Sequence, residues 1–120
     1  RRSPGDIDLL LAPEDIGTLR SVLHERHYVD AGRGPAAPPL TAVQREVYER
    51  FQCEYQFVRE SDDMVVEPHW ELTQWPLAID IGYRAMLDRA AAVQLLGRPV
   101  PMLAPEDLLV ALCVHGAKHR

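Results

Sequence analysis

The chain has 120 residues, 47% of them hydrophobic and 26% charged, which is ordinary for one soluble globular domain with a real core. Its formal net charge of -5 argues against a general nucleic-acid-binding protein and favours a nucleotide or another small molecule as partner. No apolar run approaches a membrane span and no signal pattern opens the chain, so we expect a cytoplasmic protein without a membrane partner. Cys53 and Cys113 share no metal-binding spacing, and we expect free, buried thiols.

The chain opens on residues 5–11, Gly-Asp-Ile-Asp-Leu-Leu-Leu, which predict a strand buried on both faces. Side chains two residues apart on a strand share a face, so Asp6 and Asp8 are expected to point together while Ile7 and Leu9 enter the core. Two carboxylates on a rigid strand favour a Mg²⁺ site. A solvated Asp-rich turn is the commoner alternative, so this interpretation needs support from other residues.

Pro13 predicts the first turn of a helix, because a proline at that position loses no hydrogen bond. Residues 28–29 predict a short strand, and residues 32–39, rich in Gly and Pro, predict a loop. Residues 40–51 predict a second helix that begins with a capping box at Thr41. The expected buried stripe of the first helix consists of Ile16, Leu19, Val22 and Leu23.

Residues 53–59 and 64–72 predict the two arms of a hairpin that turns at two adjacent aspartates. The second arm carries Glu67 and His69 on one face and delivers a third carboxylate to the sheet. Pro68 lies between them and cannot donate to a β-ladder, so we expect either a sheet edge or a bulge at this position.

The remaining residues predict a helix at 81–89, short strands at 93–96 and 100–103, and a last helix at 105–119. Strands and helices therefore alternate along the chain. The expected fold class is α/β (α+β), with helices packed on a mixed β-sheet.

Five segments spread over nearly all of the chain resemble a known family. They are Arg2 followed by Gly-Asp-Ile-Asp-Leu-Leu, Pro-Glu-Asp at 13–15, Glu-Pro-His-Trp at 67–70, Pro-Glu-Asp-Leu-Leu at 105–109 and His-Gly-Ala-Lys-His at 115–119. This pattern is similar to that of the uncharacterised bacterial nucleotidyltransferase-like proteins of the polymerase-beta-type superfamily.

The resemblance implies a nucleotidyltransferase-like fold and transfer of a nucleoside monophosphate from a nucleoside triphosphate. The unknown acceptor would be a protein, an RNA end or a small molecule. Asp6, Asp8 and Glu67 would be the catalytic residues and would bind Mg²⁺ or Mn²⁺, and Glu67 would also deprotonate the acceptor hydroxyl. His69 would orient groups at the site.

Further residues are expected to contact the nucleotide. Arg2 and Lys118 would contact phosphates. The alternative for Arg2 is to balance the charge of the nearby aspartates, and the alternative for Lys118 is to interact with the dipole at the end of its helix. Gly5, at the start of the acidic strand, is also expected to contact the nucleotide. Trp70 and Trp75 are expected in the core rather than stacked on a base.

The family's Gly-Ser or Gly-Gly phosphate-binding turn comes before the first acidic strand, and its position would precede Arg1. We therefore expect residues 1–120 to be a single domain truncated at both ends. Glu67 stands where the family usually has Asp. Two alternatives follow, a catalytically inactive interaction module of the same fold and a small zinc-binding protein that uses His69, His115 and His119.

Overall fold

The computed structural model describes residues 5–32, 38–74 and 82–118, and helices are interspersed with strands along them. A 3₁₀ turn at Pro13–Asp15 precedes the first helix. The elements are β1 (Ile7–Leu10), α1 (Ile16–Glu25), β2 (Tyr28–Asp30), α2 (Ala42–Phe51), β3 (Phe57–Arg59), β4 (Met64–His69), α3 (Tyr83–Arg89), β5 (Ala91–Leu95), β6 (Arg98–Met102) and α4 (Pro105–Lys118).

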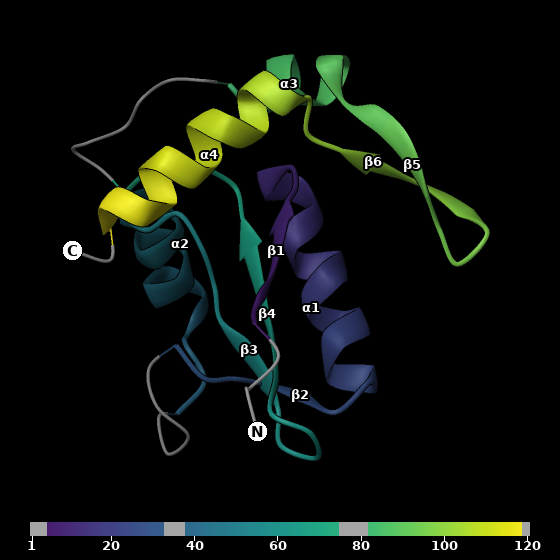
Figure 1. Ribbon diagram of the computed structural model, residues 1–120. Helices are drawn as coiled ribbons and strands as arrows, with labels where there is room; N and C mark the ends of the chain where they lie inside the picture. Colours follow the sequence, from purple (N-terminus) through teal and green to yellow (C-terminus); the bar gives the residue numbers. More distant parts are fainter. Residues whose placement is uncertain (1–4, 33–37, 75–81, 119–120) are drawn as a thin grey trace.

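The first four strands form a mixed sheet in the order β1-β4-β3-β2. β1 runs parallel to β4, whereas the β2–β3 and β3–β4 pairs are antiparallel. β5 and β6 form a separate antiparallel hairpin that extends away from the sheet (Figure 1). The expected α/β (α+β) class, with helices packed on a mixed sheet, is confirmed.

The hydrophobic core lies between one face of this sheet and the helices α1 and α2. Tyr55 stacks on Tyr48 of α2 with ring centroids 5.0 Å apart, and the guanidinium of Arg20 in α1 lies 4.5 Å from the centre of the Tyr55 ring. Trp70 is buried, as expected, and donates from Nε1 to the Glu49 carbonyl at 3.1 Å. The buried cluster comprises Ile16, Leu23, Tyr28, Tyr55, Phe57, Val66 and Trp70.

Local signals in the sequence start α2 as expected, whereas the β5–β6 hairpin turns at Leu96 and Gly97, so Leu96 is not part of the strand predicted at 93–96. The Thr41 hydroxyl accepts from the Gln44 amide at 3.3 Å, and the Gln44 side chain accepts from the Thr41 amide at 3.0 Å. This reciprocal pair is the predicted capping box. At the hairpin turn, Leu96 and Gly97 have φ of 51° and 77°, the left-handed backbone that a tight two-residue hairpin turn requires.

Three predictions of burial are wrong. Ile7 is 46% exposed and Leu9 is 37% exposed, because β1 pairs with β4 on one side only within the described residues. Val22 of α1 is exposed, and the fully buried residues of this helix are Ile16 and Leu23, the first and last of the predicted stripe. Both cysteines are free, as expected, but Cys113 is exposed.

Pro68 lies at neither an edge nor a bulge, which corrects the other expectation. β4 lies between β1 and β3. Val66 pairs with Phe57 before the proline and His69 pairs with Glu54 after it, so the register is the same on both sides of Pro68. The Pro68 carbonyl still accepts from the Tyr55 amide at 3.0 Å. The ladder therefore omits one donor and continues, so an inner strand tolerates this proline.

Some predicted features lie outside the described residues, namely Arg2, Trp75, His119 and the middle of the loop at 33–37. Within the described residues, each helix is too short or too polar to cross a bilayer.

Tyr55 makes the stability of the fold depend on pH in the alkaline range. Its hydroxyl donates to Glu49 Oε1 at 2.8 Å, and burial together with this acidic neighbour raises the pKa of Tyr55 from 10.0 to about 12. The unfolded chain then releases this proton first as pH rises. The stabilisation is complete below about pH 10 and is lost as pH approaches about 12.

We therefore predict that Tyr55→Phe flattens the fall of the free energy of unfolding between about pH 10 and about pH 12. Urea unfolding across this range measures it, with Tyr83→Phe as the matched control. An equally steep fall in wild type and Tyr55→Phe would contradict the assignment.

Candidate functional site

The parallel pairing of β1 with β4 brings two acidic residues face to face. In the register of this pair Asp8 lies opposite Glu67, and Leu10 lies opposite His69. Because side chains two residues apart share a strand face, Asp8, Glu67 and His69 project from the same face of the sheet. Their carboxylate oxygens and ring nitrogen lie within 4.8 Å of one another. These three side chains are called the Asp8 cluster below.

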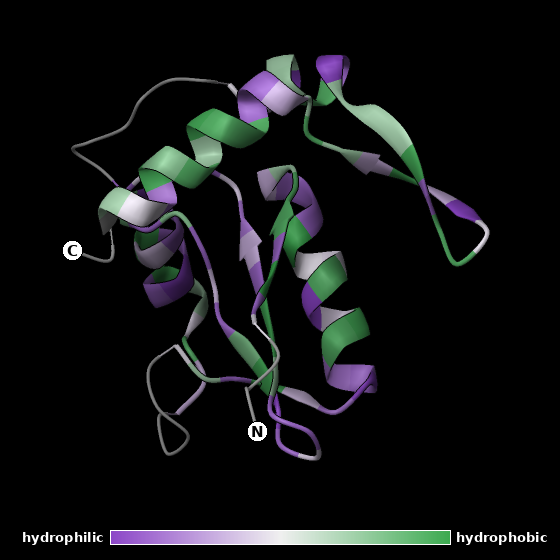
Figure 2. Ribbon diagram, viewed as in Figure 1, coloured by the Kyte–Doolittle hydropathy of each residue, from purple (hydrophilic) through white to green (hydrophobic). Residues whose placement is uncertain are grey.

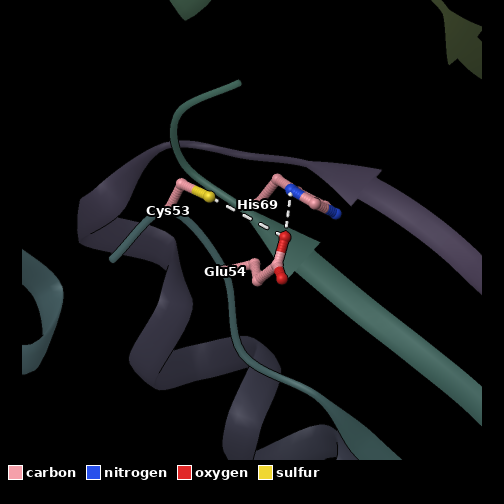
Figure 3. Close-up of side chains that lie close together, drawn as sticks. All are labelled: Cys53, Glu54 and His69. Carbon is pink, nitrogen blue, oxygen red and sulfur yellow. Dashed lines mark hydrogen bonds and ion pairs between the residues drawn. The ribbon is translucent and has the colours of Figure 1, made fainter. Parts of the chain in front are cut away.

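His69 lies between two carboxylates. Its Nε2 is 3.1 Å from Asp8 Oδ1, and its Nδ1 is 3.3 Å from Glu54 Oε2. Figure 3 shows the second contact, with Glu54 reaching the ring from the segment that precedes β3. His69 is only 9% exposed, whereas Asp8 is exposed. The imidazole is therefore held in a fixed orientation that is open toward solvent only on the Asp8 side.

Glu67 is buried, with 8% of its surface exposed, and it receives a hydrogen bond from the neighbouring strand segment. Gln56 Nε2 donates to Glu67 Oε1 at 2.7 Å. A buried carboxylate without a donor is costly, so this amide both stabilises Glu67 and fixes the direction of its carboxylate.

Cys53 contacts the carboxylate of Glu54. The thiol is completely buried and donates to Glu54 Oε2 at 3.7 Å, the same oxygen that His69 Nδ1 approaches (Figure 3). Cys53, Glu54 and His69 thus form a second group of metal-compatible ligand atoms, within 4.8 Å of one another. The two groups share only the imidazole of His69.

A pocket of about 530 Å³ opens beside the Asp8 cluster. Asp8 and His69 are on its wall, and most of the remaining wall is apolar and comes from β1, β6 and α4. Figure 2 shows hydrophobic residues along much of α4. His115 of α4 also lines the pocket and is half-buried. A pocket of this size and lining accommodates a small organic molecule.

The other predicted site residues are not among the three side chains of the Asp8 cluster. Asp6 is exposed, one residue before β1, and it is not among the carboxylates grouped there within the described residues. A side chain built on Gly5 would meet no atom within 4 Å. Lys118 is the last residue of α4, and Arg2 lies outside the described residues.

Sequence reasoning missed Glu54 and Gln56. The residues between Cys53 and Phe57 alternate, with Tyr55 and Phe57 directed to the core and the two polar side chains to the other face. Aligning the two predicted hairpin arms so that Glu54 lies opposite His69 and Gln56 opposite Glu67 would have identified both residues from the sequence.

A family model described as "Uncharacterised nucleotidyltransferase" matches residues 1–120. The chain belongs to this nucleotidyltransferase family. No curated protein and no solved structure matches the chain significantly. Membership confirms the resemblance seen in the five sequence segments and supports a nucleotidyltransferase-like function.

The ligand atoms of the Asp8 cluster are compatible with a divalent ion in this nucleotidyltransferase fold. Carboxylate oxygens are the preferred protein ligands of Mg²⁺ and Mn²⁺, and an imidazole nitrogen adds affinity for transition metals. Asp8 and Glu67, which come from neighbouring strands, provide the oxygens.

We predict that Gln56→Leu, measured in EDTA, lowers the free energy of unfolding by about 1.5–3 kcal/mol, because a buried charged acceptor loses its donor. The Gln56→Leu/Glu67→Leu double variant should lose less, since no unpaired carboxylate remains. Urea unfolding gives both values, with Gln94→Leu on the β5–β6 hairpin as control. Additive losses in the double variant would show that the two side chains do not interact.

Proposed function

We propose that this chain forms the metal-binding centre of a nucleotidyltransferase that moves a nucleoside monophosphate from a nucleoside triphosphate to an acceptor hydroxyl. The observation that carries the proposal is the register of β1 and β4, which sets Asp8 opposite Glu67 beside a pocket. Family membership supports the same reaction class.

Asp8 and Glu67, with Asp6 from the start of the same acidic segment, are the proposed ligands of Mg²⁺ or Mn²⁺. Such an ion would neutralise phosphate charge and lower the pKa of the attacking hydroxyl. Repulsion among clustered carboxylates is relieved when a cation binds, so the arrangement favours cation binding.

Glu67 is the proposed general base. Gln56 holds one of its oxygens at 2.7 Å and so aligns the carboxylate. The acceptor hydroxyl gives its proton to Glu67 as its oxygen bonds to the α-phosphorus. The bond from the α-phosphorus to the bridging oxygen breaks, and pyrophosphate leaves with the electron pair.

Phosphate binding is assigned to Arg2, to the backbone at Gly5 and to Lys118, with the ammonium acting as a point charge. The largely apolar pocket beside Asp8 and His69 supports a small organic group there, either the base of the nucleotide or part of the acceptor. The acceptor itself is a protein, an RNA end or a small molecule.

We predict that Mg²⁺ or Mn²⁺ raises the melting temperature, because an ion that binds only the folded state adds about 2.7 kcal/mol at one hundred times its Kd. Asp6→Asn/Asp8→Asn should abolish this response in differential scanning fluorimetry. Asp63→Asn is the matched control, since Asp63 lies in an exposed turn with φ of 56°, which Asn also adopts. An equal shift in wild type and in the double variant would place the ion elsewhere.

Nucleotide transfer itself is tested by titrating the protein with ATP, CTP, GTP and UTP in Mg²⁺. Pyrophosphate release is then followed with water, the protein and an RNA pool as acceptors. Glu67→Gln should lower kcat by about 10²–10⁴-fold, the usual contribution of a general base. Glu60→Gln, in the exposed turn after β3, is the control and should retain turnover.

The outcomes of this assay separate the alternatives. Full turnover by Glu67→Gln would remove Glu67 from the role of base. Nucleotide binding without turnover in any acceptor would favour the inactive interaction module. Zinc in the purified protein that is lost with His115→Gln would favour the zinc-binding alternative.

A further inference from the structure

We infer that His69 is itself a metal ligand through Nε2, and that Glu54 is the positioning residue that makes it one. The ion at the Asp8 cluster would then be a first-row transition-metal ion such as Mn²⁺ in preference to Mg²⁺. This inference rests on the proposed function, because it assumes an ion at Asp8 and Glu67.

The contact with Glu54 assigns the proton of the imidazole. An ionised carboxylate only accepts hydrogen bonds, so the 3.3 Å contact between Glu54 Oε2 and Nδ1 places the proton on Nδ1. In the neutral ring the lone pair is then on Nε2. Glu54 therefore selects the tautomer in which Nε2 is able to bind a metal.

The Nε2 side of the ring faces Asp8. Asp8 Oδ1 is 3.1 Å from Nε2, so an ion bound by Asp8 in the plane of the ring would also lie within reach of this nitrogen. Glu67 provides a further oxygen within 4.8 Å of both. This surrounds one position with two carboxylates and a nitrogen.

Glu54 has the geometry of a residue that supports a ligand. A histidine that binds a metal through one nitrogen usually donates from the other to a carboxylate, which fixes the ring and raises its basicity. Cys53 donates to the same oxygen of Glu54 at 3.7 Å from a completely buried position. The thiol therefore aligns Glu54, which in turn aligns His69.

An ion held by Cys53, Glu54 and His69 is the competing interpretation. It would lie at Nδ1 of His69, on the side of the ring where Glu54 and the completely buried Cys53 are found. Asp8 and His69 line the pocket, whereas Cys53 and Glu54 are not among its lining residues. The pocket therefore gives access to the Nε2 side of the ring, where the Asp8 cluster lies.

The ligand set decides the type of ion. Mg²⁺ favours an octahedral shell of oxygens and retains its waters, whereas transition-metal ions accept imidazole together with carboxylates. One nitrogen in the first shell should thus shift the preference of the site away from Mg²⁺.

The test uses the protein loaded with Mn²⁺ and competed with Mg²⁺. Pulsed electron paramagnetic resonance of wild-type protein should show coupling of Mn²⁺ to a histidine nitrogen. His69→Gln should lose that coupling and the preference for Mn²⁺ over Mg²⁺. Calorimetry should show Mn²⁺ affinity reduced about 10–100-fold in Glu54→Ala, and less in Glu54→Gln, whose amide oxygen still accepts from Nδ1.

Glu60→Gln is the control for loss of one negative charge, and melting curves in EDTA establish that each variant is folded. If His69→Gln does not fold, the wild-type spectrum and the Glu54 variants decide the question.

Each contrary result is distinct. Mn²⁺ bound without nitrogen coupling, at an affinity dependent on Asp8, overturns the role of His69 and leaves the proposed function intact. Thiolate-to-metal absorption with Co²⁺ that disappears in Cys53→Ser overturns the inference by placing the ion beside Cys53. Wild-type protein that binds neither Mg²⁺ nor Mn²⁺ overturns the inference together with the proposed metal dependence.

Discussion

The parallel pairing of β1 with β4 is the constraint on which the rest of the candidate site depends. This pairing joins residues about sixty positions apart in the chain and sets Asp8 beside Glu67 on one face of the sheet. A shift of one residue in the register would send one of them to the opposite face. The Leu11 amide donates to the His69 carbonyl at 3.0 Å, so the hydrogen bonding continues one residue beyond the end of β1.

The β3–β4 hairpin serves the core and the site at the same time. Tyr55, Phe57 and Val66 face the helices, while Gln56 and Glu67 alternate with them on the other face. Large aromatic rings on the core side hold the backbone in place, so the polar side chains keep fixed positions with little freedom of their own. The site therefore derives its rigidity from the packing beneath it.

Each polar side chain of the candidate site has a partner close to it. Gln56 donates to Glu67, and His69 contacts Asp8 on one side and Glu54 on the other. In the described part of the chain, no buried side-chain nitrogen or oxygen lacks a hydrogen-bond partner. This satisfaction of polar groups lets carboxylates lie close together next to an apolar pocket without destabilising the sheet.

The sequence by itself determined the succession of strands and helices and the capping box at Thr41, because these follow from local periodicity and short motifs. It also marked Asp8, Glu67 and His69 as candidate site residues through the family motifs. Only the tertiary structure decided that β4 is an inner strand despite Pro68, that Ile7 is exposed, and that Glu67 and His69 are the side chains grouped with Asp8. It also decided that Glu54 contacts His69 and that Gln56 donates to Glu67. Strand order and register arise from contacts between distant segments, and a period of two shows which residues share a face but not which partner they meet there.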